Sequence, residues 1–199
     1  MSAAPVIGVL ALQGDVPEHL RALEDVGARA IAVRRPEEVH QLDGMVIPGG
    51  ESTTLWRLSV AFDMLEPLRK LIASGLPSFG SCAGMIMLAD RLADGVDGQQ
   101  TFGGIDMTVR RNAFGRQVDS FESDIMLSGL GGALLRAVFI RAPWVEQNGG
   151  NVTVLGTEQR TGRIVAVRQG PLLATAFHPE LTPDRRIHEL FVEIVKDNT

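Results

Sequence analysis

The only cysteine of the chain, Cys82, lies in the stretch FGSCAGMIML at residues 79–88, between Gly80 and Gly84. A Gly-x-nucleophile-x-Gly turn that joins a strand to a helix is typical of a nucleophile elbow, in which small neighbours tolerate a strained turn that exposes the central side chain. The amides and the dipole at the start of the following helix favour the thiolate, which is the reactive form. A lone cysteine is more often an inert core residue, so the turn alone leaves both interpretations open.

A cysteine nucleophile needs a base, and the chain has four histidines. His19 and His188 fall in expected helices beside charged residues and are interpreted as surface residues, while His40 lies in a polar connection. His178 instead follows the apolar run LLATAF. Because ligands bind outside the carboxyl ends of strands in a parallel sheet, we expect His178 to meet Cys82 at that edge.

Glu180 follows His178 in the tripeptide HPE. The proline favours extended backbone at His178, and in an extended chain residues two apart point to the same side. Glu180 is therefore expected to hydrogen-bond the far ring nitrogen of His178, which would fix the tautomer and stabilise the imidazolium, as in a catalytic triad. Taken alone, HPE is more often a surface turn.

The stretch VIPGGES leads from an expected strand into two glycines, whose free amides can form a concave anion-binding nest. No Gly-Lys-Ser/Thr follows, which argues against a P-loop, and LQGDVPEH lacks the dinucleotide glycine pattern. We expect an oxyanion hole made by the N–H groups of Gly50 and Ala83, which would stabilise a tetrahedral intermediate. The alternative is a flexible turn before a helix that starts at Ser52.

Strand and helix patterns alternate in the first half of the chain, which indicates parallel strands joined by right-handed crossovers. In the second half, strand-like segments separated by turns precede one last helix. The expected strands are 6–12, 28–35, a segment within 42–50, 76–82, 105–111, 118–127, 137–143, 151–159, 163–170 and 172–180. The expected helices are 15–27 with Asp15 as the cap, 52–75 with a break near Pro67, 83–93 and 183–197. We predict an α/β fold in one domain over 1–199: a three-layer, mostly parallel central sheet with helices on both faces, flavodoxin-like, with an added antiparallel segment.

Composition excludes several classes of protein. Hydrophobic residues make up 45% and charged residues 22% of the 199 residues, which is ordinary for a globular protein and not for a disordered chain. A net charge of −5 gives no reason to expect nucleic acid or an anionic membrane as a partner. A single cysteine cannot form an internal disulfide. We expect neither a signal peptide nor a transmembrane helix, because the first residues lack a basic region followed by an apolar stretch and no run approaches about 18 apolar residues. A soluble, cytoplasmic protein is expected.

The Gly-Gly turn, the cysteine elbow and the His-x-Glu pair, in this order, resemble the class I (triad) glutamine amidotransferases. The stretches DGMVIPGGESTT, RNAFGRQVDSFE, FIRAP and FHPELT are more specific. They resemble the glutaminase subunits of pyridoxal 5′-phosphate synthase over essentially the whole chain.

The resemblance implies hydrolysis of L-glutamine to L-glutamate and ammonia, with Cys82 as the nucleophile, His178 as the general base and acid, and Glu180 as the orienting carboxylate. It places Gln13 near the oxyanion region and the partner contact. Which arginine binds the substrate carboxylate stays open. The implied substrate contacts are Gly50, Glu51, Ser52, Arg111, Ile140 and Arg141.

The resemblance also implies a partner, a separate (β/α)8 barrel synthase subunit that receives the ammonia in a hetero-oligomer and makes pyridoxal 5′-phosphate. No metal or cofactor is implied for this chain. Ser81 and Ala113 depart mildly from relatives and are expected not to affect the mechanism. The alternatives are another triad-type glutaminase or Cys-His-acid hydrolase, and a non-catalytic regulatory subunit of the same fold.

Overall fold

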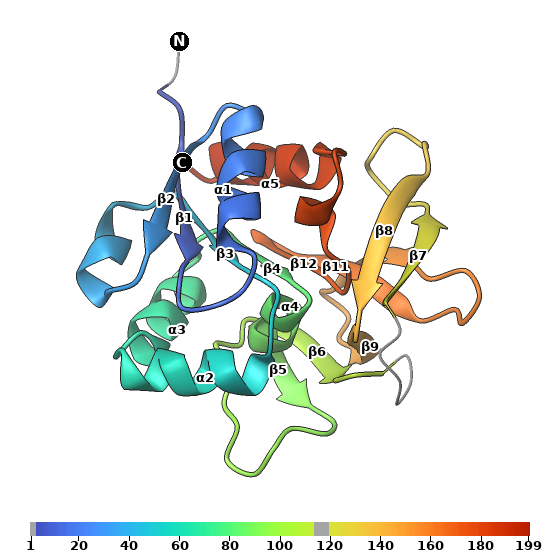
Figure 1. Ribbon diagram of the computed structural model, residues 1–199, viewed down its shortest axis with the longest axis horizontal. Helices are drawn as coiled ribbons and strands as arrows, with labels where there is room; N and C mark the ends of the chain where they lie inside the picture. The colour runs from blue at the N-terminus through green and yellow to red at the C-terminus, as the bar shows by residue number, and fades with distance from the viewer. Residues whose placement is uncertain (1–2, 114–119) are drawn as a thin grey trace.

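A computed structural model describes residues 3–113 and 120–199 of the chain. Residues 114–119, which carry part of the stretch RNAFGRQVDSFE and the start of the expected strand 118–127, lie outside the described residues. The predicted α/β fold is confirmed: a large sheet is covered by helices on both faces, and antiparallel strands extend it (Figure 1).

The parallel half of the sheet has the strand order β2-β1-β3-β4-β12. All of its neighbouring strands pair in parallel. Buried strands of this kind are continuously apolar because helices cover both faces. The strands are β1 (Val6–Leu10), β2 (Arg29–Val33), β3 (Gly44–Ile47), β4 (Ser78–Ser81) and β12 (Leu172–Thr175).

Helices form two layers on this half of the sheet. Helix α1 (Val16–Asp25) lies beside α5 (Arg186–Asp197) on one face (Figure 1). Helices α2 (Ser52–Ala61), α3 (Leu65–Ala73) and α4 (Ala83–Leu88) lie on the other. Buried apolar residues recur along α5 at helical spacing, which is why this amphipathic helix packs flat against the sheet.

The other half of the sheet is mainly antiparallel. Its strand order continues from β12 through β11, β9, β6 and β5, with β10 paired to β11, and β7 and β8 form a separate antiparallel pair. These strands are β5 (Ala89–Leu92), β6 (Ile105–Arg110), β7 (Ser120–Ile125), β8 (Leu135–Ile140), β9 (Trp144–Asn148), β10 (Thr153–Thr157) and β11 (Ile164–Gln169). Two 3-10 turns, η1 (Pro36–Gln41) and η2 (Pro179–Leu181), complete the described elements.

Two details of the expected helices are wrong. The expected helix 83–93 ends at Leu88, because pairing with β6 draws the next residues into β5. The break in 52–75 falls at 62–64, where Asp63 has φ 55°. Pro67 lies in the first turn of α3, where proline is tolerated because its amide has no partner within the helix.

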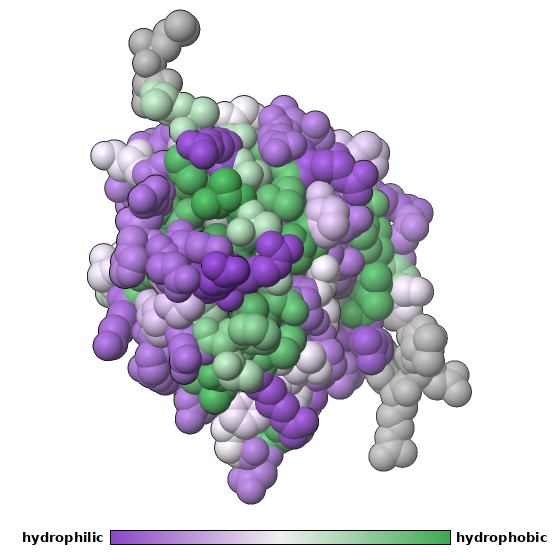
Figure 2. All heavy atoms as spheres, turned by 60° about the vertical axis from the view of Figure 1, so that its left-hand side comes forward, coloured by the Kyte–Doolittle hydropathy of each residue, from purple (hydrophilic) through white to green (hydrophobic). Residues whose placement is uncertain are grey.

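Strand β9 was missed altogether, since its end was interpreted as part of a turn. Asp15 precedes α1 as expected, but its side chain makes no capping hydrogen bond. Within the described residues, no helix combines the length and the apolar character needed to cross a bilayer. Figure 2 shows the side of the molecule beyond β2, where a band of hydrophilic side chains separates the apolar areas.

Register brings the two motifs of the sequence together. Ser81, the last residue of β4, is directly opposite Thr175, the last residue of β12. Cys82 therefore leaves the sheet beside the segment that leads to His178. The edge at which both strands end is the edge expected for a ligand site in a parallel sheet.

Gly84 lets α4 approach β3 closely enough to hold this turn. A Cβ at Gly84 would collide with the backbone carbonyl of Ile47, which side-chain motion cannot relieve. Helix propensity alone would favour alanine by about 1 kcal/mol, yet we expect Gly84→Ala to destabilise the protein by about 1–3 kcal/mol because of this collision. Urea unfolding measures the difference at unchanged m-value.

The matched control is Gly150→Ala, since a Cβ at Gly150 meets nothing within 4 Å. It should change stability by less than about 0.5 kcal/mol. Equal stability of the two variants would contradict the close approach of α4 and β3.

Candidate active site

Cys82 occupies a sharp turn between β4 and α4. Its backbone has φ 48° and ψ −103°, a strained conformation for a residue with a side chain. The turn is held by a hydrogen bond of 2.8 Å from the Cys82 N–H to the Thr175 carbonyl. The side chain is nearly buried, and Sγ lies 3.8 Å from the Ile140 carbonyl oxygen. The geometry is that of the nucleophile elbow expected from the sequence.

His178 and Glu180 meet as expected, by a different backbone route. Glu180 Oε1 lies 2.7 Å from His178 Nδ1. The chain does not stay extended beyond His178, however, because Pro179 starts the 3-10 turn η2. The turn, together with a 2.9 Å hydrogen bond from the His178 N–H to the Val138 carbonyl, places both side chains on one side.

The pocket at this edge of the sheet has a volume of about 190 Å³. Cys82 and His178 line it, while Glu180 lies behind the His178 ring and is fully buried. All six residues expected to contact substrate also line it: Gly50, Glu51, Ser52, Arg111, Ile140 and Arg141. Sequence reasoning did not select four further lining residues, Gly14, Asp15, Ile86 and Asn112.

Glu51 and Arg111 bring charge to the pocket. The Glu51 carboxylate caps α2 by accepting the N–H groups of Thr53 at 3.0 Å and Thr54 at 2.7 Å. Burial opposes ionisation, but these amide hydrogen bonds prevail and lower the pKa of Glu51. The Arg111 guanidinium donates to Gln99 at 2.6 Å and lies 3.9 Å from Glu51. The pocket thus presents a fixed cation and a fixed anion.

Gln13 spans the Gly-Gly turn at the end of β3. Its side chain accepts the Glu51 N–H at 3.2 Å and donates to the Gly49 carbonyl at 3.4 Å. Gly50 has φ 135°, and a Cβ there would collide with the Gln13 amide. Gln13 therefore fixes the turn from which the Gly50 amide is expected to serve the oxyanion hole, and that role stays a prediction.

The model of the SNO glutamine amidotransferase family matches residues 9–197 of this chain. The chain belongs to this family. A protein of Acidothermus cellulolyticus named pyridoxal 5′-phosphate synthase subunit PdxT is 64% identical over 197 residues, and the match covers 98% of this chain and 95% of that protein. A protein of the same name in Rhodococcus jostii is 60% identical over 197 residues, and the match covers 96% of this chain and 98% of that protein. The resemblance expected from the motifs is confirmed.

A solved structure agrees with this membership of the SNO family. A crystal structure described as a glutamine amidotransferase has 44% identity and a TM-score of 0.88, and the match covers 96% of this chain and 98% of that one. A putative GMP synthase component from Thermoplasma acidophilum, at 18% identity and TM-score 0.71, covers 99% of this chain and 96% of that one. At that identity it shows the fold alone.

Charges around His178 favour its protonated form. Burial disfavours the imidazolium, but hydrogen bonds to Asp15, Cys82 and Glu180 outweigh burial and raise the pKa of His178 to about 12. Burial likewise opposes ionisation of Glu180, but the His19 and His178 rings outweigh it and hold the pKa of Glu180 below its usual range. An imidazolium beside an ionised carboxylate is the state that supports a cysteine thiolate.

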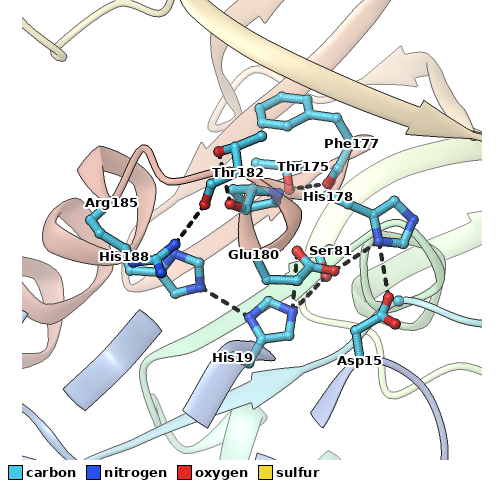
Figure 3. Close-up of polar contacts among 12 residues, drawn as sticks. Asp15, His19, Ser81, Thr175, Phe177, His178, Glu180, Thr182, Arg185 and His188 are labelled. Atoms are coloured by element: carbon cyan, nitrogen blue, oxygen red, sulfur yellow. Dashed lines mark hydrogen bonds and ion pairs between the residues drawn. The ribbon is translucent and has the colours of Figure 1, made fainter. Parts of the chain in front are cut away.

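Asp15 is a neighbour of His178 that sequence reasoning assigned to helix capping. Its Oδ2 lies 3.3 Å from His178 Nδ1, the same ring nitrogen that bonds Glu180 (Figure 3). Among the described residues, Asp15, His178 and Glu180 form the one group whose ligand atoms all lie within 4.8 Å of one another, close enough for a metal. The short bond from Nδ1 to Glu180 requires a proton on that nitrogen, so we assign no metal to the group.

The interpretation of His19 and His188 as surface residues is wrong, since both are 0% exposed. His19 Nδ1 lies 3.0 Å from His188 Nε2, and His19 Nε2 lies 3.0 Å from Ser81 Oγ (Figure 3). Charged neighbours in the sequence suggested exposure. The helical period held the better signal, because each histidine falls on the same helix face as buried apolar residues.

The lowered pKa of Glu180 predicts how acid affects stability. The unfolded carboxyl has its ordinary pKa of 4.5 and the folded one a lower value. Ionised Glu180 thus stabilises the fold above about pH 4.5, and this contribution is lost as the pH falls below it. We expect the urea midpoint of the wild type to fall more steeply between about pH 5 and about pH 3.5 than that of Glu180→Gln.

Glu193→Gln, an exposed position on α5, is the control and should follow the wild type. Parallel acid profiles of wild type and Glu180→Gln would mean that the folded carboxyl titrates normally.

Proposed function

We propose that this chain is the glutaminase subunit of a pyridoxal 5′-phosphate synthase and hydrolyses L-glutamine to L-glutamate and ammonia. The observation that carries the proposal is the meeting of Cys82 with the His178–Glu180 pair on a pocket that also holds a fixed cation and a fixed anion. Membership of the SNO glutamine amidotransferase family supports it.

The proposed mechanism is acyl transfer through Cys82. The thiolate attacks the carboxamide carbon of glutamine, and the His178 imidazolium donates its proton to the departing nitrogen, which leaves as ammonia. The glutamyl thioester is then attacked by a water molecule whose proton His178 accepts. The C–S bond breaks, glutamate leaves, and the proton on His178 restores the starting pair. Because Glu180 bonds Nδ1, the nitrogen left to exchange protons is Nε2.

The negative charge of the tetrahedral intermediate needs donors, and we assign them to the N–H groups of Gly50 and Ala83. Gln13 sets the conformation of the Gly50 turn through its two hydrogen bonds. We expect little activity from the isolated chain, with the partner needed to complete this oxyanion site.

Glutamine presents an α-carboxylate and an ammonium, which suit a pocket that contains Arg111 and Glu51. We assign the carboxylate to Arg111 in preference to Arg141. The Arg111 side chain is only 13% exposed and is held by Gln99 and Thr53. A pre-organised guanidinium loses less conformational entropy on binding.

The proposed partner is a (β/α)8 barrel synthase subunit, and the two chains would form a hetero-oligomer. Ammonia in water protonates and diffuses away, so direct transfer across the interface fits the chemistry of the product. The similarity to proteins named as subunits of this synthase supports the partnership. A cytoplasmic location belongs to the same proposal and is supported by the single cysteine.

Cys82→Ala tests the reaction. Without the nucleophile, glutamate release in the presence of the synthase subunit should fall by roughly 10⁴-fold or more. An unchanged urea midpoint and co-elution with the synthase subunit serve as the control for folding and assembly. Residual hydrolysis above about one-hundredth of wild type would refute a cysteine mechanism.

Arg111→Leu tests substrate binding. Loss of a charge-assisted contact of about 1.5–3 kcal/mol should raise KM for glutamine by roughly 10- to 150-fold. Arg141→Leu is the matched comparison and should raise KM less. The reverse order would assign the α-carboxylate to Arg141.

A further inference from the structure

Glu180 is buried behind the pocket with an unequal set of contacts. Its side chain is 0% exposed, and Oε1 bonds His178. Oε2 has no hydrogen-bond partner of ordinary geometry among the described residues, and it faces His19 Nε2 at 3.4 Å. A buried carboxylate oxygen without a hydrogen bond is costly. The His19 ring is the group in position to hold that oxygen in place.

The position of the proton on His19 follows from its neighbours. An ionised carboxylate can only accept, so we place the ring proton of His19 on Nε2, which faces Glu180 Oε2 and Ser81 Oγ. Its other nitrogen faces His188 Nε2 at 3.0 Å. Burial and the nearby His19 ring lower the pKa of His188 to about 3, so His188 is neutral. A neutral His188 can satisfy His19 Nδ1 in either of two ways, by donating a proton from its Nε2 or by accepting one there.

These contacts form a chain of polar groups that reaches the active site from the α1–α5 layer (Figure 3). It runs from His188 on α5 through His19 on α1 to Glu180 and His178. Ser81, the residue before Cys82, contacts the same ring through its Oγ. The other charged groups around the chain are Asp15, beside His178, and Arg185, which acts on His188.

We propose that His19 is a positioning residue of the active site, whose Nε2–H holds the Glu180 carboxylate in the orientation that bonds His178 Nδ1. His188 and Ser81 fix the His19 ring in turn, which gives Ser81 an indirect part in the mechanism that was not expected from the sequence. The inference deepens the proposed glutaminase function and rests on it for its kinetic consequence. His19 does not line the pocket, so its effect on substrate must pass through Glu180 and His178.

The first test needs no catalysis. Nitrogen NMR of the four histidine rings, assigned with single variants, should show that His19 Nε2 carries a proton. In His19→Leu, the His178 Nδ1 signal should move, because its carboxylate partner has lost its orientation. In His19→Gln, whose side-chain amide keeps an N–H donor, the signal should lie closer to that of the wild type. Unprotonated Nε2, or an unmoved His178 signal in His19→Leu, would overturn the proposal.

The second test uses the complex with the synthase subunit. His19→Leu should lower kcat by roughly 10- to 100-fold, the range for a group that orients a functional side chain by a hydrogen bond. KM should stay within about two-fold of the wild-type value. The pH profile of kcat/KM should shift, and His19→Gln should recover part of the lost rate. Exposed His40→Gln is the control and should match the wild type. If His19→Leu fails to fold, the kinetics of His19→Gln and the histidine NMR spectrum of the wild type still test the proposal.

Other results separate the explanations. Ser81→Ala should lower kcat less than His19→Leu, and equal losses would mean that His19 acts on the cysteine turn instead. If His19→Leu and His19→Gln lower kcat equally and leave the pH profile of kcat/KM unchanged, the role of His19 is merely structural. A wild-type complex that releases no glutamate, with the NMR results as expected, would refute the proposed function and leave the positioning of Glu180 intact.

Discussion

The parallel pairing of β4 with β12 is the constraint on which the site depends. It sets Ser81 opposite Thr175, and the bond from the Cys82 N–H to the Thr175 carbonyl extends the pairing one residue beyond the sheet. Side chains alternate between the two faces of a strand, so a register slip of one residue would turn the next segment to the wrong face. Nearly a hundred residues separate Cys82 from His178, and the register of two four-residue strands brings them together.

The buried carboxylate of Glu180 imposes a second demand. Ionised groups inside a protein are tolerated when donors surround them, and removal of one partner leaves the charge uncompensated. Here the donors come from different parts of the chain: His178 lies after β12, and His19 belongs to a helix on the face of the sheet. The packing of α1 and α5 is thus linked to the electrostatics of the pocket. A core made only of apolar side chains at these positions would leave Glu180 unable to stay ionised.

Sequence reasoning identified those features that short stretches of the chain reveal by themselves. The cysteine turn, the His-x-Glu pair and most strands show in short stretches, and their meeting follows from the rule for parallel sheets. Strand β9 and the early end of α4 could not be found in this way, because pairing with β6 decides both. His19 was misplaced for another reason: polar histidines beside charged residues suggested exposure, whereas the pairing of two such rings across α1 and α5 makes their burial possible.

The loop after β1 joins the remaining parts of the site. Gln13 holds the Gly-Gly turn through Gly49 and Glu51, and Asp15, two residues later, lies against His178. Gly14 between them approaches the Gly49 carbonyl so closely that no Cβ would fit. The turn expected to stabilise the oxyanion and the residue expected to move the proton therefore both contact one three-residue segment. A displacement of this loop would therefore disturb the expected oxyanion site and the proton transfer by His178 together.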